Sequence, residues 1–182
     1  TTLFRSILKV ATDYGFDDNL WHNYLTFFLM MSENPFSMTC EKVGASEGSV
    51  NALVENDFRI FKALFDYDFG PIERDLGINC FSQISNYKAI HKKDLMYNKN
   101  VSEKVRSLSK KLEAAKDEKE FFDAVTGFYK DYGVGMFGLN KAFRIDDTPQ
   151  GSFTFRAINN MDTVMLDDLV GYEIQKKKLV DN

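Results

Sequence analysis

The chain has 182 residues, of which 44% are hydrophobic and 27% are charged, values typical of a globular domain. Seventeen Phe and eight Tyr can bury large apolar surfaces, which excludes a disordered chain. Cys40 and Cys80 lie far apart, so a disulfide scaffold or a zinc site is not expected. Without a signal peptide or an apolar run long enough to span a membrane, we expect a cytoplasmic protein that has no membrane partner.

Apolar residues recur at a spacing of three or four over residues 2–14, which predicts an amphipathic helix. A second helix is expected from about Leu20 to just before Pro35, capped by Asp17 and Asp18. This second helix is apolar nearly all round, so we expect it to be central to the core or covered by a partner.

Pro35 is expected to start a short third helix, which Gly44 closes. Ser46 or Ser49 can cap a long fourth helix, which is expected to run to the break at Gly70-Pro71. Residues 71–76 are expected to add a helical turn.

Residues 78–100 alternate weakly between apolar and polar and give no clear prediction. A helix is predicted from Val101 to about Lys116, and Asp117 with Glu120 forms a capping-box pattern for the next one. Gly133 lies where a left-handed C-cap is expected.

After Gly133 the period changes from helical to alternating. Residues 142–145 and 152–158 alternate in polarity and flank a polar segment over residues 146–151, which predicts a hairpin with a six-residue loop. Because an isolated two-stranded ribbon is marginal in water, the hairpin is expected to lean on the helices or on a neighbour.

The predicted fold class is therefore mainly α, a multi-helix domain followed by a small β-hairpin and a C-terminal helix. We expect a helical domain over residues 1–133, a hairpin appendage over 134–160, and a linker with the C-terminal helix over 161–182.

Residues 133–138 match the Gly-x-Gly-x-x-Gly string of dinucleotide-binding folds. That string works between a strand and a helix, so that the helix N-terminus meets the pyrophosphate. Here a helix is predicted before it and a strand after it. We interpret the string as a helix stop and a flexible turn.

No self-contained active site can be assembled from the sequence. His22 lies on an apolar helix, and His91 lies beside two lysines, where neighbouring positive charge disfavours its protonation. Neither histidine has a nucleophile or carboxylate at a spacing that suggests a triad. We expect no catalytic residues and no metal ligands.

Residues 83–111 form a basic segment in an acidic protein, with eight Lys or Arg against two Asp or Glu. With Tyr87 and Tyr97 interleaved, the segment could bind single-stranded nucleic acid by stacking and phosphate contacts. The simpler interpretation is a solvated helix face, and the sequence pI of about 5.3 is low for a nucleic-acid-binding domain. The lysines that would test the nucleic-acid hypothesis are Lys92, Lys93, Lys110 and Lys111.

The last seventeen residues, 166–182, contain an apolar turn, Leu169-Val170-Gly171, and then a charged helix that starts near Tyr172. Acidic residues precede the helix, and Lys176, Lys177 and Lys178 lie toward its C-terminal end, which matches the helix dipole.

The string Leu-Val-Gly-Tyr-Glu-x-Gln resembles the segment just before the phosphate-binding loop of AAA+ ATPases. The whole segment 166–182 is similar to the start of the ATPase core in an uncharacterised bacterial AAA+ family, long known only as a domain of unknown function. Residues 33–41, the Tyr132-Gly-Val-Gly stretch and the Ala142-Phe-Arg strand also resemble that family's N-terminal region.

The resemblance implies that Asp168, Leu169, Val170 and Gly171 contact the adenine in the full-length protein. No Gly-Lys pair occurs in the chain, so we expect a fragment truncated before the Walker A motif, which binds no cofactor itself. The full-length protein is expected to bind ATP and Mg²⁺, and the resemblance allows it to form an oligomer.

Three functions follow as hypotheses. The first is a non-catalytic N-terminal recognition or regulatory domain of a AAA+ ATPase, whose partners are the ATPase core of the same chain and an unknown protein or nucleic-acid target. The alternative is a nucleic-acid-binding module that uses residues 83–111. The third is a small freestanding enzyme with a site assembled from distant residues.

Overall fold

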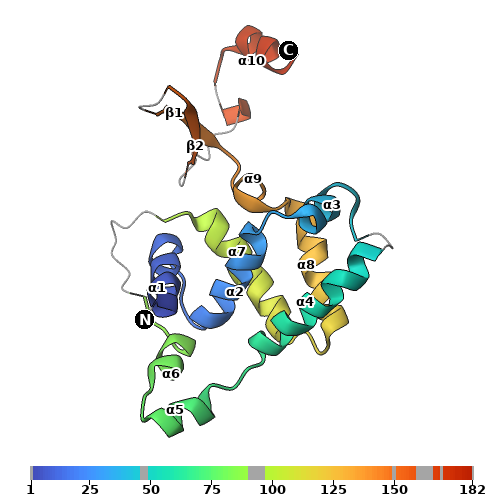
Figure 1. Ribbon diagram of the computed structural model, residues 1–182. Helices are drawn as coiled ribbons and strands as arrows, with labels where there is room; N and C mark the ends of the chain where they lie inside the picture. The colour runs from blue at the N-terminus through green and yellow to red at the C-terminus, as the bar shows by residue number, and fades with distance from the viewer. Residues whose placement is uncertain are drawn as a thin grey trace.

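The computed structural model describes residues 2–45, 49–89, 97–148, 151–158, 166–168 and 170–181. The protein is mainly α-helical, with a two-stranded antiparallel hairpin and a C-terminal helix after the helical domain, as predicted (Figure 1). Within these residues, every helix is too short or too polar to cross a bilayer.

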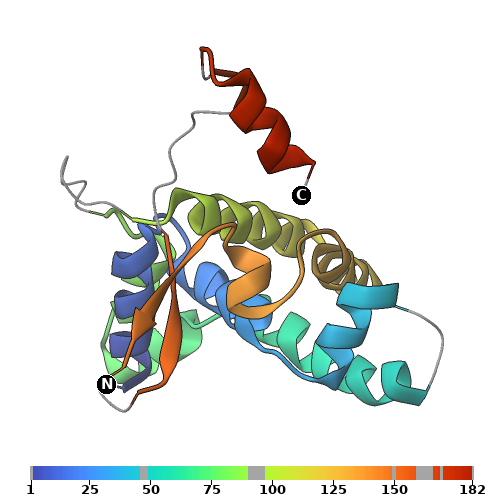
Figure 2. The same cartoon turned by 90° about the horizontal axis from the view of Figure 1, so that it is seen from above.

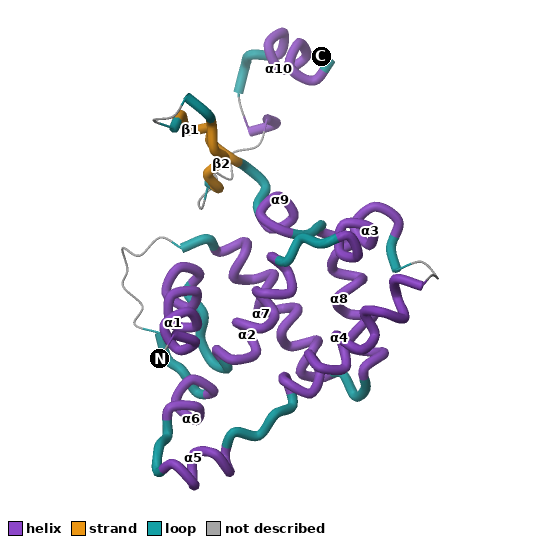
Figure 3. The backbone as a smooth tube through the Cα atoms, in the orientation of Figure 1, coloured by secondary structure: helices purple, strands orange, loops and turns teal. Residues whose placement is uncertain are grey.

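The elements follow one another along the chain as Figure 3 shows. The helices of the N-terminal domain are α1 (Thr2–Tyr14), α2 (Leu20–Met31), α3 (Pro35–Val43), α4 (Ser49–Phe65), α5 (Gly70–Leu76), α6 (Cys80–Ser85), α7 (Lys99–Ala114), α8 (Glu118–Tyr132) and α9 (Gly135–Leu139). The hairpin strands β1 (Phe143–Asp147) and β2 (Phe153–Ala157), a 3-10 turn (Leu166–Asp168) and α10 (Glu173–Val180) complete the chain.

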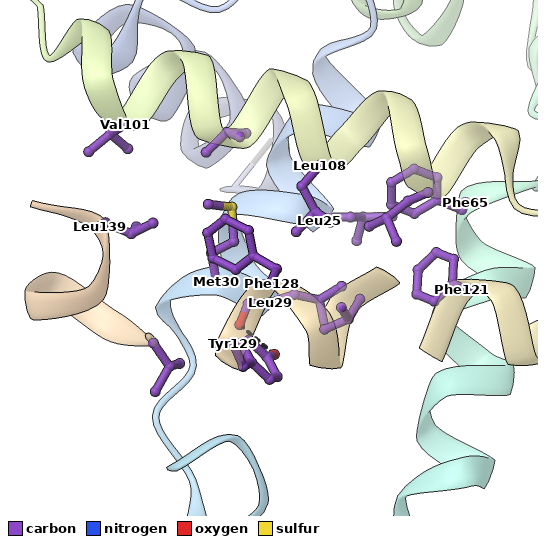
Figure 4. Close-up of a cluster of buried hydrophobic side chains, with 14 of the residues drawn as sticks. Leu25, Leu29, Met30, Phe65, Val101, Leu108, Phe121, Phe128, Tyr129 and Leu139 are labelled. Atoms are coloured by element: carbon purple, nitrogen blue, oxygen red, sulfur yellow. Dashed lines mark hydrogen bonds between the residues drawn. The ribbon is translucent and has the colours of Figure 1, made fainter. Parts of the chain in front are cut away.

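Helix α2 is central to the core, as its nearly all-apolar sequence predicts. It packs against α1, α4, α6, α7 and α9, while α8 packs against α3, α4 and α7. Figure 4 shows the side chains that meet between α2, α7 and α8. Among them the hydroxyl of Tyr129 donates a hydrogen bond to the Leu29 carbonyl at 2.9 Å, so this buried polar group is satisfied.

The N-cap of α2 is Asn19, whose side chain accepts a hydrogen bond from the His22 backbone N–H at 3.1 Å. The prediction that Asp17 and Asp18 cap this helix was wrong. Asp18 has a left-handed φ of 65° and forms a backbone bridge with Tyr87. The Asp17 carboxylate accepts from the Ala89 N–H at 2.7 Å. Both residues are thus used to bind a distant segment.

Helix α4 ends at Phe65, before the predicted break at Gly70-Pro71. Two side chains of α2 bond its last carbonyl groups: Trp21 Nε1 donates to the Leu64 oxygen at 2.8 Å, and His22 Nε2 bonds the Phe65 oxygen at 2.8 Å. Of the two predicted N-caps, Ser46 lies outside the described residues, and Ser49 is the first helical residue.

The cap of α8 follows the prediction, because the Asp117 side chain accepts from the Glu120 N–H at 2.8 Å. The Glu120 carboxylate accepts a hydrogen bond from the Lys116 N–H at 2.8 Å. In a capping box it would accept from the N–H of the N-cap residue, Asp117, one position later. Gly133 has the predicted positive φ of 83°, but its ψ of −177° is extended and not left-handed helical.

Two short helices escaped prediction because their ends are capped by distant side chains. The Glu73 carboxylate accepts from the N–H groups of Phe81 and Ser82 at 2.7 and 2.9 Å, at the start of α6, and also from the Ser82 hydroxyl. These bonds, above all that from the Ser82 hydroxyl, lower the pKa of Glu73. At the end of α9, Lys104 Nζ donates to the carbonyl oxygens of Gly138 and Leu139 at 3.0 and 3.3 Å.

The helical core extends through α9, because Val134 and Leu139 are buried in it. The hairpin follows directly. Its register pairs Ile145 with Phe155 and Asp147 with Phe153, so the strands continue to Asp147 and the connecting loop covers residues 148–152. The predicted loop over 146–151 therefore began two residues too early.

Candidate functional site

The glycine string of residues 133–138 has a packing role. A Cβ built on Gly138 would lie 2.3 Å from the Gly133 carbonyl carbon, so the two backbones meet where no side chain fits. The Val134 N–H donates to the Glu41 carboxylate at 3.1 Å. The string ends α8, as predicted, but its last four residues begin the short helix α9 (Gly135–Leu139) and do not form a flexible turn. The predicted strand, β1, is the next element.

His22 is placed as a structural residue. Its Nε2 must carry the proton, because its partner, the Phe65 carbonyl oxygen, can only accept. The ring stacks on Phe65 with centroids 4.4 Å apart. Nδ1 is buried, forms no hydrogen bond with a described residue, and lies 3.8 Å from Glu113 Oε1. The groups that surround the ring therefore give it no nucleophile to activate.

The remaining catalytic candidates are dispersed. Cys40 is buried, which raises the pKa of its thiol and disfavours the reactive thiolate. Cys80 is half-buried on α6. His91 lies outside the described residues. Among the residues that are described, no three His, Cys, Asp or Glu side chains come close enough together to hold a metal ion.

Two surface hollows are lined by other residues. One of about 850 Å³ runs along the outer side of α1, and one of about 530 Å³ lies between α4 and α8. The first is lined by Phe4, Arg5, Leu8, Lys9, Thr12 and Asp13. The second is lined by Glu55, Phe58, Arg59, Glu118, Lys119, Phe122 and Asp123. Neither includes His22 or a cysteine.

The basic segment 83–111 is only partly described, because Lys92 and Lys93 fall in the undescribed residues 90–96. Tyr87 packs against the core, and the Tyr97 ring lies against Gly15, at whose position a Cβ would come within 2.9 Å of it. Both rings are half-buried and used in packing. Rings held in packing contacts are less available to stack on nucleic-acid bases, so the structure gives this part of the hypothesis less support. Lys110 and Lys111 are exposed and remain as candidates for phosphate contacts.

Of the four residues expected to contact adenine, the structure describes three, and these lie at the C-terminal end, away from the helical core. Asp168 ends the 3-10 turn and is exposed, and Leu169 is outside the described residues. Val170 is 94% exposed. Gly171 has a φ of +83° with open space around it, so its conformation and not crowding favours glycine here.

Helix α10 presents apolar side chains to solvent. Ile174, Leu179 and Val180 are all at least 70% exposed. Figures 1 and 2, in views 90° apart, both show α10 separated from the helical domain. The lysines follow the predicted pattern, because Lys177 and Lys178 lie in the last turn. Asp167 and Asp168, the acidic residues expected at the helix start, lie instead in the preceding 3-10 turn, and Glu173 is the acidic residue of the first turn.

The hairpin has one apolar and one polar face. Alternation and register place Phe143, Ile145, Phe153 and Phe155 on the same side. The other side carries Arg144, Asp146, Thr154 and Arg156, with an ion pair between Arg156 Nε and Asp146 Oδ2 at 2.7 Å. Phe137 of α9 packs on the apolar face, with ring centroids 4.9 Å from Phe143 and 5.5 Å from Phe155.

Most of this apolar face remains open, because Ile145 and Phe153 are 62% and 63% exposed. Together with Phe137 it forms what we call the hairpin patch: Phe137, Phe143, Ile145, Phe153 and Phe155. The sequence predicted that the hairpin leans on the helices or on a neighbour, and the contact with Phe137 of α9 is a contact of the first kind, but these residues were not singled out. The Phe-x-Phe alternation at 153–155 was the signal that could have identified them.

Comparison of the chain with family models, with curated proteins and with solved structures finds no match.

Proposed function

We propose that the protein is a non-catalytic recognition or regulatory domain of a cytoplasmic AAA+ ATPase. In this proposal the helical domain contacts the target, and residues 166–181 form the edge of the ATPase core that holds adenine. The described residues bring no catalytic constellation together, which is compatible with such a role.

The observation that carries the proposal is the exposure of the C-terminal segment. Val170, Ile174 and Leu179 are open to solvent, although apolar side chains of this size are usually buried. Exposed apolar side chains gathered in one short segment are what a surface covered by another body would present. The segment that bears them is also the one whose sequence resembles the start of an ATPase core.

Val170, Gly171 and Tyr172 have features that suit contact with an adenine ring. Val170 offers an apolar side chain for the face of the purine, and the positive φ of Gly171 and Tyr172 turns the backbone sharply before α10. When bound, ATP with Mg²⁺ would supply the phosphoryl group whose hydrolysis drives the ATPase. The residues of this chain would hold only the purine.

The first test is the gene sequence after Asn182. A Gly-x-x-x-x-Gly-Lys-Ser/Thr string within the next thirty or so codons is expected, because the phosphate loop follows the adenine edge closely in P-loop ATPases. A gene that continues without such a string would contradict the proposal.

The second test measures ATP affinity in the longer gene product. Val170→Glu should weaken ATP binding by roughly tenfold or more, since a buried carboxylate would face the purine. The matched control is Val43→Glu on α3, which changes another exposed valine on the helical domain and should leave ATP affinity unchanged. Equal affinities for all three proteins would remove Val170 from the site.

A further inference from the structure

The hairpin patch lies between two groups of opposite charge. Asp147, at the tip of β1, falls on the apolar face, because it alternates with Phe143 and Ile145. At the base, Lys141 lies two residues before β1, and its positive charge acts on Lys104 of α7. The apolar surface therefore has an acidic end and a basic end.

These charges lack opposite partners in the part of the chain that the structure describes. Asp146 pairs with Arg156, but Asp147 forms no ion pair with a described residue. Lys104 and Lys141 likewise have no carboxylate partner there. Burial, and then the nearby charge of Lys141, lower the pKa of Lys104. An incoming carboxylate would relieve this repulsion.

We propose that the hairpin patch is a self-association surface, on which a second copy of the chain docks its own hairpin patch in the antiparallel orientation. A two-fold axis that crosses the strands reverses their direction. It places Asp147 of each copy toward the base of the other, where Lys104 and Lys141 lie. The apolar side chains between these ends then pack face to face.

The charge arrangement favours a second copy over an unrelated partner. A two-fold interface must be complementary to itself, and a surface with opposite charges at its two ends meets that condition when the copies are antiparallel. A parallel arrangement would place like charges together. The two aromatic rings that project most, Phe137 and Phe153, supply the kind of anchor that dominates binding at small interfaces.

The size of the surface sets the strength of the interaction. Five-residue strands at a rise of about 3.4 Å give a face of roughly 17 Å by 10 Å. This is well below the roughly 800 Å² per partner of a standard stable interface, so the association should be weak and reversible. Concentration dependence is therefore the appropriate measurement.

The test is sedimentation velocity of the chain, residues 1–182, from about 10 μM to 1 mM at low salt. The weight-average sedimentation coefficient should rise with concentration. Phe153→Ser with Phe155→Ser should weaken association roughly tenfold or more, because the apolar anchors are lost. The matched control, Leu76→Ser on α5, removes an exposed apolar side chain elsewhere and should leave association unchanged.

Charge exchange tests the orientation, and these exposed positions carry little risk to the fold. Asp147→Lys and Lys141→Glu should each weaken association by roughly three- to tenfold, and the double variant should restore it. Circular dichroism and thermal melting would verify that each variant keeps the helical domain.

A chain that stays monomeric over the whole concentration range would overturn the proposal. So would association that is insensitive to the hairpin variants, or that Ile174→Ser in α10 abolishes instead. A double charge variant no better than the single variants would overturn the antiparallel pairing. The outcomes that concern concentration and the hairpin variants do not bear on the ATPase proposal, which rests on residues 166–181 and on the gene that follows. Loss of association in Ile174→Ser would count against both proposals.

Discussion

The helical domain and the C-terminal region use the same kinds of residue in opposite ways. In the helical domain Leu112, Val105 and Phe121 are fully buried. Figure 4 shows part of this core, where Phe121 lies beside Phe65 of α4. In the hairpin and α10, Ile, Phe, Leu and Val side chains face solvent. The buried apolar residues of the first region are explained by contacts within the chain, and the exposed apolar residues of the second are not.

This difference indicates which part of the molecule is stable without contacts to other bodies. An eight-residue helix and a two-stranded hairpin are each below the size that is stable in water without support. Their exposed apolar groups are thus best explained as contacts with other bodies: an ATPase core for α10 and a second copy for the hairpin patch.

The largest expected effect separates the two regions by stability. Leu112→Ala should lower the free energy of unfolding by about 3–5 kcal/mol, because it leaves a cavity in the core. Ile174→Ala in α10, where the side chain is 71% exposed, should change it by less than about 0.5 kcal/mol. Urea denaturation followed by circular dichroism measures both. A large loss for Ile174→Ala would show that α10 is part of the folded domain.

A second pair compares two glycines of the same domain. Gly138→Ala should destabilise by about 2–3 kcal/mol, since its Cβ would meet the Gly133 backbone. The control, Gly127→Ala within α8, has open space and should stabilise by roughly 0.5–1 kcal/mol through helix propensity. Effects of equal sign would contradict the packing role of the glycine string.

A third variant tests the buried hydrogen bond at the centre of the core. Tyr129→Phe removes the hydroxyl that donates to the Leu29 carbonyl and should cost about 1–2 kcal/mol. Chemical denaturation of the variant is the measurement, with Tyr132→Phe on the exposed end of α8 as the control. Similar small changes for both variants would mean that water can replace this hydrogen bond.

The smallest effect concerns pH and the edge of the helical domain. Because folding lowers the pKa of Glu73 below its usual value near 4.5, its contribution is present above that pH and lost as the pH falls through the lower folded value. Glu73→Gln should therefore be less stable than the wild type at pH 7 and lose less stability on acidification. Stability measured from pH 7 to pH 3 checks this. If the stability of Glu73→Gln and of the wild type changed with pH in parallel, the role of the Glu73 carboxylate in capping α6 would be contradicted.

The helices whose signals are local were predictable, whether long or short. The Asn34-Pro35 start of α3 and the Asp117 cap of α8 are each set by residues within one turn. The start of α6 is capped by Glu73 and the end of α9 by Lys104. Because both side chains lie outside the helix that they cap, no pattern within either helix predicted it. The same reason explains the misplaced cap of α2: Asp17 and Asp18 bond residues about seventy positions away.

The candidate surfaces were predictable only in part. The turn at Val170-Gly171 stood out from its sequence, but its exposure depends on which helices pack together. The alternation of Phe153 and Phe155 indicates an apolar strand face. Only the fold shows that Phe137 covers part of that face and leaves the rest open.

The most direct test of the central claim is amide hydrogen exchange, measured on this chain and on the longer gene product that the proposal requires. We predict that α10 exchanges within seconds in the chain alone, while α7 and α8 are protected. In the longer protein α10 should become at least about tenfold slower, with α7 and α8 unchanged. Protection of α10 in the chain alone, or equally fast exchange in both proteins, would contradict the claim that an ATPase core covers residues 166–181.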